Sequence, residues 1–128
     1  MYDQALLLDK LLQIDSAIEK INRRFALIKT ADDFLDSDQG MDMLDAIAMM
    51  LIAIGENFKK IDKDTDGKLL ALYPHINWSG IKGLRDILSH QYFNIDAEEI
   101  FEICKNNLAD LHEALKNLVV NLSKSSTS

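Results

Sequence analysis

Apolar residues recur at alternating spacings of three and four along three long segments of the chain. The three stripes are Leu7, Leu11, Ile14, Ile18, Ile21, Phe25 and Ile28; Leu44, Ile47, Leu51, Ile54, Phe58 and Ile61; and Phe101, Cys104, Leu108, Leu111, Leu115, Leu118 and Leu122. This spacing places the apolar side chains on one face of a helix. It predicts helices from about Asp3 to Lys29, from about Gln39 to Lys60, and from Asp96 onward.

The segments between these stripes predict short helices and turns. Thr30 is expected to cap an acidic turn over residues 31–35, and a short helix is expected over 67–73, before Pro74. A further helix is expected over 79–92, and Asp96 with Glu99 has the pattern of a capping box at the start of the last helix. The second stripe is flanked on both sides by further apolar residues, so that helix is expected at the centre of the fold or at a subunit interface. These residues are Ala46, Ala48, Met49, Met50 and Ile52.

Because the chain has only one proline and five glycines, few positions break these helices. No segment has the alternation typical of a strand. The fold class is therefore all-α, and we predict an antiparallel up-down four-helix bundle with additional short helices. We expect residues 1–122 to form a single domain and residues 123–128 a disordered polar tail.

Composition and charge narrow the functional classes. The chain has 128 residues, one cysteine and a net charge of −7, which excludes a disulfide framework and argues against a protein that coats nucleic acid. The charge is uneven, because residues 59–91 contain six basic and four acidic residues, a local charge of +2. The longest apolar run, over 46–54, is too short to span a membrane, and the N-terminus lacks the features of a signal peptide. We therefore expect a cytoplasmic protein that does not associate with a membrane.

Acidic residues are frequent, but they do not predict a metal site. Residues 62–67 resemble the first half of an EF-hand loop, yet the position that requires a bidentate glutamate is Tyr73. We interpret this segment as a turn. The run of aspartates between residues 32 and 45 has no neighbouring histidine and is interpreted as a solvated connection. No metal and no cofactor is assigned.

Residues 78–92 contain the candidate chemistry: Arg85, His90 and Tyr92. Arginine offers a planar set of donors for phosphate, and histidine exchanges protons near neutral pH. Arg85 and Tyr92 share a helix face, whereas His90 lies about 140° around the axis, so it joins them only if the helix ends nearby. These groups suit metal-free cleavage of RNA by its own 2′-hydroxyl, which requires both a base and an acid. A symmetric dimer supplies two histidines, although the residue types alone are also compatible with structural roles.

The spacing of Arg85, His90 and Tyr92 resembles the RxxxxHxY motif of HepT-like toxins in the HEPN superfamily. The resemblance extends to Ile54-Gly55-Glu56 on the second helix, to Tyr73-Pro74 and Trp78 with residues 81–86, and to the exit at residues 92–96. It covers nearly the whole chain. The resemblance implies an antiparallel helical bundle that forms a homodimer.

The resemblance also implies a function: the toxin of a prokaryotic type VII toxin–antitoxin pair, a metal-independent endoribonuclease with its cleft at the dimer interface. In this reading Arg85 contacts the RNA phosphate and His90 acts as the acid or base. A cognate minimal nucleotidyltransferase antitoxin adenylylates Tyr92, which adds bulk and negative charge to the cleft. Glu56, Asp86 and Ser89 are candidate supporting residues. Many superfamily members have a small uncharged residue directly after the motif arginine, whereas this chain has Asp86, an acid next to the expected phosphate contact.

Two alternatives remain open from the sequence. The first is a noncatalytic substrate-binding or regulatory subunit of a nucleotidyltransferase, which would bind its partner but not cleave RNA. The second is a purely structural dimeric bundle. His75, in a loop after Pro74, and His112, beside the stripe of the last helix, are assigned no role.

Overall fold

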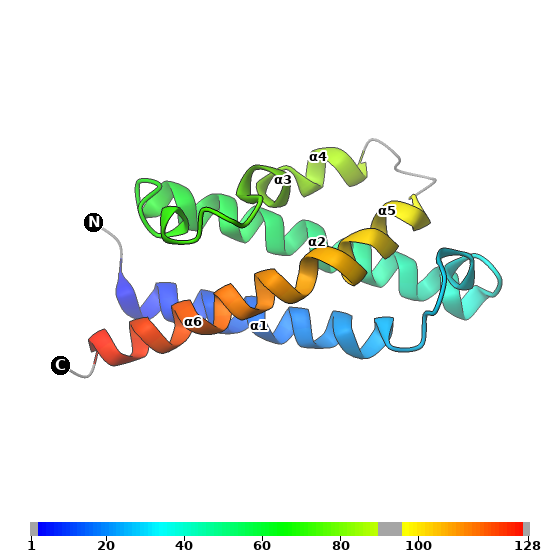
Figure 1. Ribbon diagram of the computed structural model, residues 1–128, viewed down its shortest axis with the longest axis horizontal. Helices are drawn as coiled ribbons and strands as arrows, with labels where there is room; N and C mark the ends of the chain where they lie inside the picture. Colours follow the sequence, from blue (N-terminus) through cyan, green and yellow to red (C-terminus); the bar gives the residue numbers. More distant parts are fainter. Residues whose placement is uncertain (1–2, 90–95, 127–128) are drawn as a thin grey trace.

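The computed structural model describes residues 3–89 and 96–126, and in these ranges every regular element is helical. The elements are, in order, α1 (Gln4–Phe25), η1 (Ala31–Phe34), α2 (Asp38–Asp64), η2 (Leu70–Leu72), α3 (Trp78–Lys82), α4 (Leu84–Ser89), α5 (Ala97–Glu102), η3 (Ile103–Asn107) and α6 (Leu108–Ser126). Successive long segments run in opposite directions (Figure 1). This confirms the predicted all-α antiparallel bundle.

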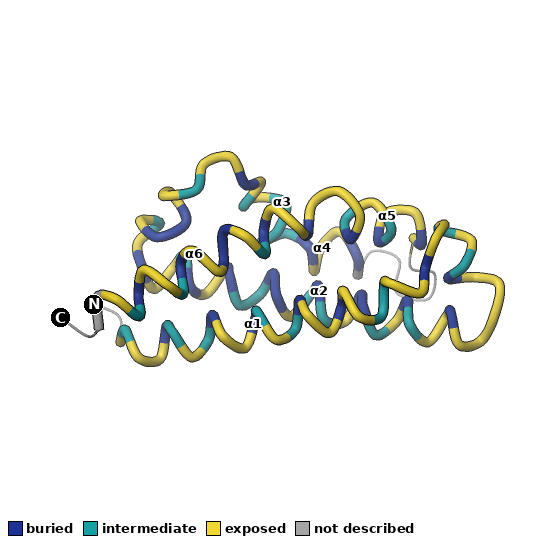
Figure 2. Tube along the Cα trace, turned by 60° about the horizontal axis from the view of Figure 1, so that its bottom comes forward, coloured by how far each residue is buried: buried dark blue, intermediate teal, exposed yellow. Residues whose placement is uncertain are grey.

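Helix α2 occupies the middle of the bundle, in contact with α1, α3, α4 and α5, while α6 packs along α1. The three apolar stripes supply the core. Leu11, Ile18, Ile47 and Phe58 are almost completely buried, and the buried parts of the helices face one another in Figure 2. The repeat of three and four residues thus determined which faces pack.

The helix starts follow the sequence. The Asp3 carboxylate accepts hydrogen bonds from the backbone N–H groups of Ala5 and Leu6, and Asp96 accepts from those of Glu98 and Glu99. Thr30 and Asp33 form a capping box around η1. The backbone N–H groups of Lys29 and Thr30 donate to the Asp33 carboxylate and lower its pKa. The connection between α1 and α2 is therefore a structured turn.

Several helix boundaries differ from the predicted ones. Helix α1 ends at Phe25 rather than near Lys29, because the Asp33 carboxylate binds the backbone of Lys29 and Thr30. Helix α2 continues past Lys60 to Asp64, which buries Ile61. The helix predicted over 67–73 is reduced to η2, and α6 extends to Ser126, beyond residue 122. The division into a domain and a polar tail stays a prediction.

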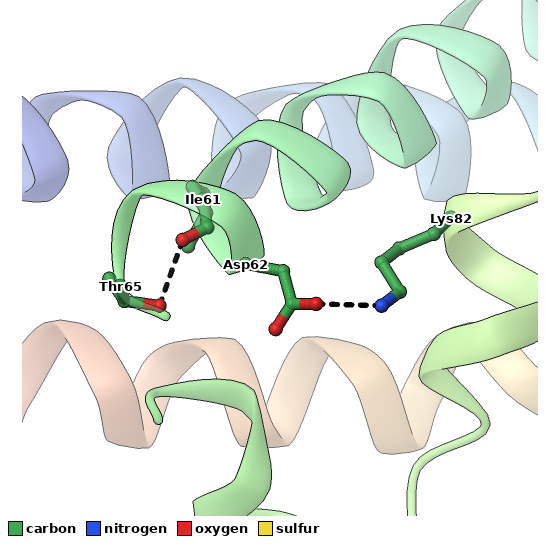
Figure 3. A network of polar contacts seen from close by, with 4 residues as sticks. All are labelled: Ile61, Asp62, Thr65 and Lys82. Atoms are coloured by element: carbon green, nitrogen blue, oxygen red, sulfur yellow. Dashed lines mark hydrogen bonds and ion pairs between the residues drawn. The ribbon is translucent and has the colours of Figure 1, made fainter. Parts of the chain in front are cut away.

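The end of α2 is organised by two side-chain contacts (Figure 3). The buried Thr65 hydroxyl donates to the Ile61 carbonyl at 2.8 Å, and the Lys82 Nζ forms an ion pair with the Asp62 Oδ2 at 2.7 Å. The chain then turns through Asp66 and Gly67, whose φ angles are 54° and 73°. The left-handed conformation explains the glycine. The residues that resemble a calcium loop therefore form a helix end and a turn, and the first carboxylate binds a lysine.

The last helical segment contains a wide turn. Residues Ile103–Asn107 are π-helical, and they join α5 to α6. Cys104 lies in this turn, and burial raises the pKa of its thiol to about 12. The thiol is therefore neutral at physiological pH and behaves as a small core residue, as predicted. Across residues 3–89 and 96–126, none of the helices combines the length and the apolarity that spanning a membrane requires.

Candidate functional site

Helix α4 carries Arg85, which contacts a carboxylate of the central helix. Arg85 Nη1 donates to Glu56 Oε1 at 2.9 Å, and the side chains are 66% and 35% exposed. The two residues are 29 positions apart in the sequence. Helix packing therefore places the arginine of the candidate motif beside the glutamate of the Ile54-Gly55-Glu56 sequence.

Gly55 allows helix α3 to approach helix α2 closely. A Cβ atom at residue 55 would overlap the backbone carbonyl oxygen of Ile81 and would lie 3.3 Å from the Leu84 Cβ. Ile54, before it, is buried in the core at 1% exposure. Each residue of Ile54-Gly55-Glu56 thus has a separate physical role: core packing, close approach of the next helix, and a partner for Arg85.

Two further side chains, those of Trp78 and Lys82, fix the segment that precedes Arg85. The Trp78 ring packs on Phe58 of α2 with centroids 5.0 Å apart, and its indole N–H donates to the Tyr73 carbonyl at 2.9 Å. The ion pair between Lys82 and Asp62 holds the last residue of α3 to the same helix. Because both anchors lie on one helix, α3 and the start of α4 have a defined position on α2.

The helix predicted over 79–92 is interrupted at Gly83. The Gly83 N–H donates to the Ser79 carbonyl and ends α3, and α4 then begins at Leu84. This break was not predicted, because glycine within a helical pattern is often tolerated. Within α4, Leu84 and Leu88 are buried, and Arg85 and Asp86 are exposed.

The electrostatics of Arg85 are dominated by Glu56. The hydrogen bond with Glu56 and its negative charge raise the pKa of the Arg85 guanidinium above its already high value. Arg85 is therefore a permanent cation. At this exposure the ion pair contributes little to folding stability, and its principal effect is to orient the planar guanidinium.

Not every predicted site residue falls in the described ranges. Asp86 is exposed on α4, and Ser89 is the last residue of that helix. His90 and Tyr92 lie outside the described residues, so their roles stay predictions. Two residues that shape the site, Gly55 and Lys82, were not predicted from the sequence. The sequence marks Gly55 only by its position directly before Glu56, and the contact with Ile81 is visible only in the structure.

A groove of about 260 Å³ lies between α3–α4 and α5–η3, and Glu56 does not line it. Its lining includes His75, Ile87, Glu99 and Asp110, and does not include Arg85. The guanidinium is therefore presented on the surface beside α2. A second exposed feature lies on α2 itself, where Met49 is 74% exposed and Ala53 is exposed one turn before Glu56.

Comparison with known proteins identifies a family for this chain. Residues 14–118 match the family model described as ribonuclease HepT-like. Three similar proteins from Methanocaldococcus jannaschii are named as putative RNases. MJ0125 is 28% identical over 109 residues, covering 78% of this chain and 90% of its own. MJ0127 is 32% identical over 93 residues, covering 70% and 71%. MJ1216 is 35% identical over 74 residues, covering 58% of each chain.

No solved structure gives a significant match. The family assignment therefore depends on the sequence match, which includes the second helix with Glu56 and the segment with Arg85. The helical bundle described above is the fold that the resemblance implied. From the match over residues 14–118 and these relatives, the chain belongs to the HepT-like ribonuclease family.

Proposed function

We propose that this chain is the toxin of a prokaryotic type VII toxin–antitoxin pair and acts as a metal-independent endoribonuclease. The observation that carries the proposal is the exposed Arg85 guanidinium, oriented by Glu56 at 2.9 Å and followed five residues later by His90. An oriented, permanently charged fork of donors is suited to a phosphodiester. Membership of a ribonuclease family supports RNA as the substrate.

The reaction requires two proton transfers. A base removes the proton of the RNA 2′-hydroxyl, and the 2′-oxygen forms a bond to the adjacent phosphorus. The bond from phosphorus to the 5′-oxygen breaks, and an acid protonates that leaving oxygen. The products are a 2′,3′-cyclic phosphate and a 5′-hydroxyl end. Arg85 compensates the charge that develops on the phosphate oxygens, and His90 is the group that accepts or donates a proton.

A second copy of the chain is expected to complete the site. One chain supplies one motif histidine, whereas the reaction uses an acid and a base. Arg85 is also 66% exposed, and charge stabilisation is weak in open water. The exposed Met49 and Ala53 lie on the same face of α2 as Glu56, at spacings of seven and three residues, and offer an apolar surface to a partner. A homodimer across this face would cover the site and bring two histidines together.

The antitoxin in this proposal is a minimal nucleotidyltransferase that modifies Tyr92. The Tyr92 phenol oxygen forms a bond to the α-phosphorus of ATP, pyrophosphate leaves, and the phenol proton is released. The tyrosine then carries an AMP group with a negative charge. In this proposal the AMP phosphate competes with the RNA phosphate for the Arg85 guanidinium, and its bulk obstructs access to the cleft.

The test is cleavage of a fluorescent RNA by the purified chain in the presence of EDTA. We expect cleavage that persists without divalent ions, 2′,3′-cyclic phosphate ends, and a loss of activity of at least about 100-fold in His90→Ala, since removing a general acid or base typically costs that much. The exposed loop variant His75→Ala is the matched control. If the wild-type dimer binds a nucleotidyltransferase but never cleaves RNA, the chain is instead a regulatory subunit of that enzyme.

Glu56 is expected to act as a positioning residue for Arg85. Glu56→Ala should lower kcat/KM for RNA about 10-fold, because the guanidinium loses its fixed orientation. Glu56→Gln keeps an oxygen acceptor for Arg85 Nη1 and should recover most of the activity. Steady-state kinetics with the two variants check this. Equal loss in both would mean that the negative charge of Glu56 matters, and full activity in both would remove Glu56 from the site.

A further inference from the structure

Helices α1 and α6 bring three potential metal ligands together on the side of α2 away from α4 (Figure 1). Asp15 and Glu19 are one turn apart on α1, and His112 lies on α6. One ligand atom of each residue lies within 4.8 Å of the other two. Asp15 and His112 are 97 positions apart in the sequence, so only the packing of α6 on α1 creates the cluster.

The distances are close to those of a metal site. Zinc binds histidine nitrogen and carboxylate oxygen at about 2.0–2.2 Å, so tetrahedral ligand atoms are about 3.4 Å apart. The His112 Nε2 and the Asp15 Oδ1 are 2.8 Å apart and would separate slightly around an ion. The Glu19 side chain is exposed and has the rotamer freedom to move inward.

The charges favour a cation. Within the described ranges, neither Asp15 nor Glu19 forms an ion pair with a lysine or an arginine. Two carboxylates therefore face one imidazole, without a permanent positive charge paired to them. The Asp15 and His112 side chains are 24% and 15% exposed, so their interaction is partly shielded from water.

We propose that Asp15, Glu19 and His112 bind a divalent transition-metal ion, with zinc as the preferred occupant, and that the ion joins α1 to α6. One imidazole with two carboxylates is a donor set that suits zinc better than magnesium or calcium, which prefer oxygen ligands only. A water molecule would complete the tetrahedron. The role is structural, because α1 and α4 lie on opposite sides of α2 and Arg85 is on α4.

Zinc binding to the untagged, full-length chain tests the site. We expect saturable 1:1 binding by calorimetry and no comparable binding of Mg²⁺. Zinc at about 100 times its Kd should raise Tm by roughly 10 °C, since it binds the folded state only. Co²⁺ should give the absorption bands of a tetrahedral site without a thiolate charge-transfer band, which separates this cluster from binding at Cys104.

Three variants assign the ligands. Asp15→Asn keeps an acceptor for His112 and should retain the Tm of the metal-free protein while weakening zinc binding at least 10-fold. Glu19→Gln changes an exposed residue and should weaken it similarly, as should His112→Ala, whereas His75→Ala should bind zinc as the wild type does. A wild-type Kd above about 1 mM, or an unchanged Kd in Asp15→Asn and Glu19→Gln, would overturn the proposal and leave a hydrogen bond between Asp15 and His112. Zinc binding is measured without RNA cleavage, so the result does not depend on whether the chain is a ribonuclease.

Discussion

Arg85→Ala is expected to lower RNA cleavage strongly while leaving the fold intact. The variant removes the cation that faces the scissile phosphate, and loss of one well-placed donor to a developing charge typically costs 10²–10³-fold. We expect kcat/KM to fall about 1,000-fold, equivalent to about 4 kcal/mol of transition-state stabilisation. Because the side chain is 66% exposed, Tm should change by no more than about 2 °C. RNA cleavage assays and thermal denaturation monitored by circular dichroism measure the two effects.

Two further variants define what Arg85 contributes. Arg85→Lys keeps the charge but lacks the planar fork, so it should recover only a small part of the lost activity. Arg23→Ala removes an exposed arginine on α1, far from α4, and should cleave RNA as the wild type does. Wild-type cleavage by Arg85→Ala would refute the assignment of the phosphate contact. Equal losses in Arg85→Ala and Arg23→Ala would indicate an effect of net charge instead.

Gly55→Ala should damage both the fold and the site, although alanine is the better helix former. The added Cβ would overlap the Ile81 carbonyl oxygen, which is backbone and cannot rotate away. Overpacking costs about 1–3 kcal/mol, and the gain in helix propensity offsets up to about 1 kcal/mol of it. Because the overlap is severe and involves backbone, the cost should reach the upper end of this range, about 3 kcal/mol. We therefore expect a net loss of about 2 kcal/mol and a fall in Tm of roughly 7 °C. Denaturant unfolding monitored by circular dichroism measures the change.

The effect on activity should exceed the effect on stability. Helix α3 must move away from α2, and Arg85 on the following helix then separates from Glu56. Cleavage assayed well below Tm should fall at least 10-fold. The matched controls are Ile18→Val and Ile18→Ala, at a fully buried core residue of α1. One should destabilise the fold less than Gly55→Ala and the other at least as much, so together they bracket its loss of stability. If these variants lose as much activity per folded molecule as Gly55→Ala, close packing at Gly55 has no particular role in placing Arg85.

The positions and faces of the long helices followed from the sequence, because they depend on local periodicity. Leu11 and Ile18 on α1, and Ile47 and Phe58 on α2, are buried as their spacing predicted. The caps at Asp3, Thr30 and Asp96 depend on side chains within three residues and were also predictable. The predicted helix boundaries were less accurate where a helix ends at a contact that the apolar periodicity does not encode. The break at Gly83 and the early end of α1 are the clearest cases.

The candidate site was predictable only in part. The resemblance identified Arg85, His90 and Tyr92 by their spacing, and Glu56 by its short motif. The reason for Gly55 became clear only when Ile81 was found against it, since a glycine in a helix has no local signature for a close neighbour. Lys82 likewise has no motif, and its ion pair with Asp62 depends on the angle at which α3 crosses α2.

The sequence by itself determined the helical class, the buried faces and the motif that assigns the family, because periodicity, capping and spacing are properties of neighbouring residues. Tertiary structure decided which distant groups meet. It placed Glu56 against Arg85 across 29 positions and Asp15 against His112 across 97. Such pairs depend on how one helix is rotated and offset against another, which is set by the packing of whole faces and not by any short segment.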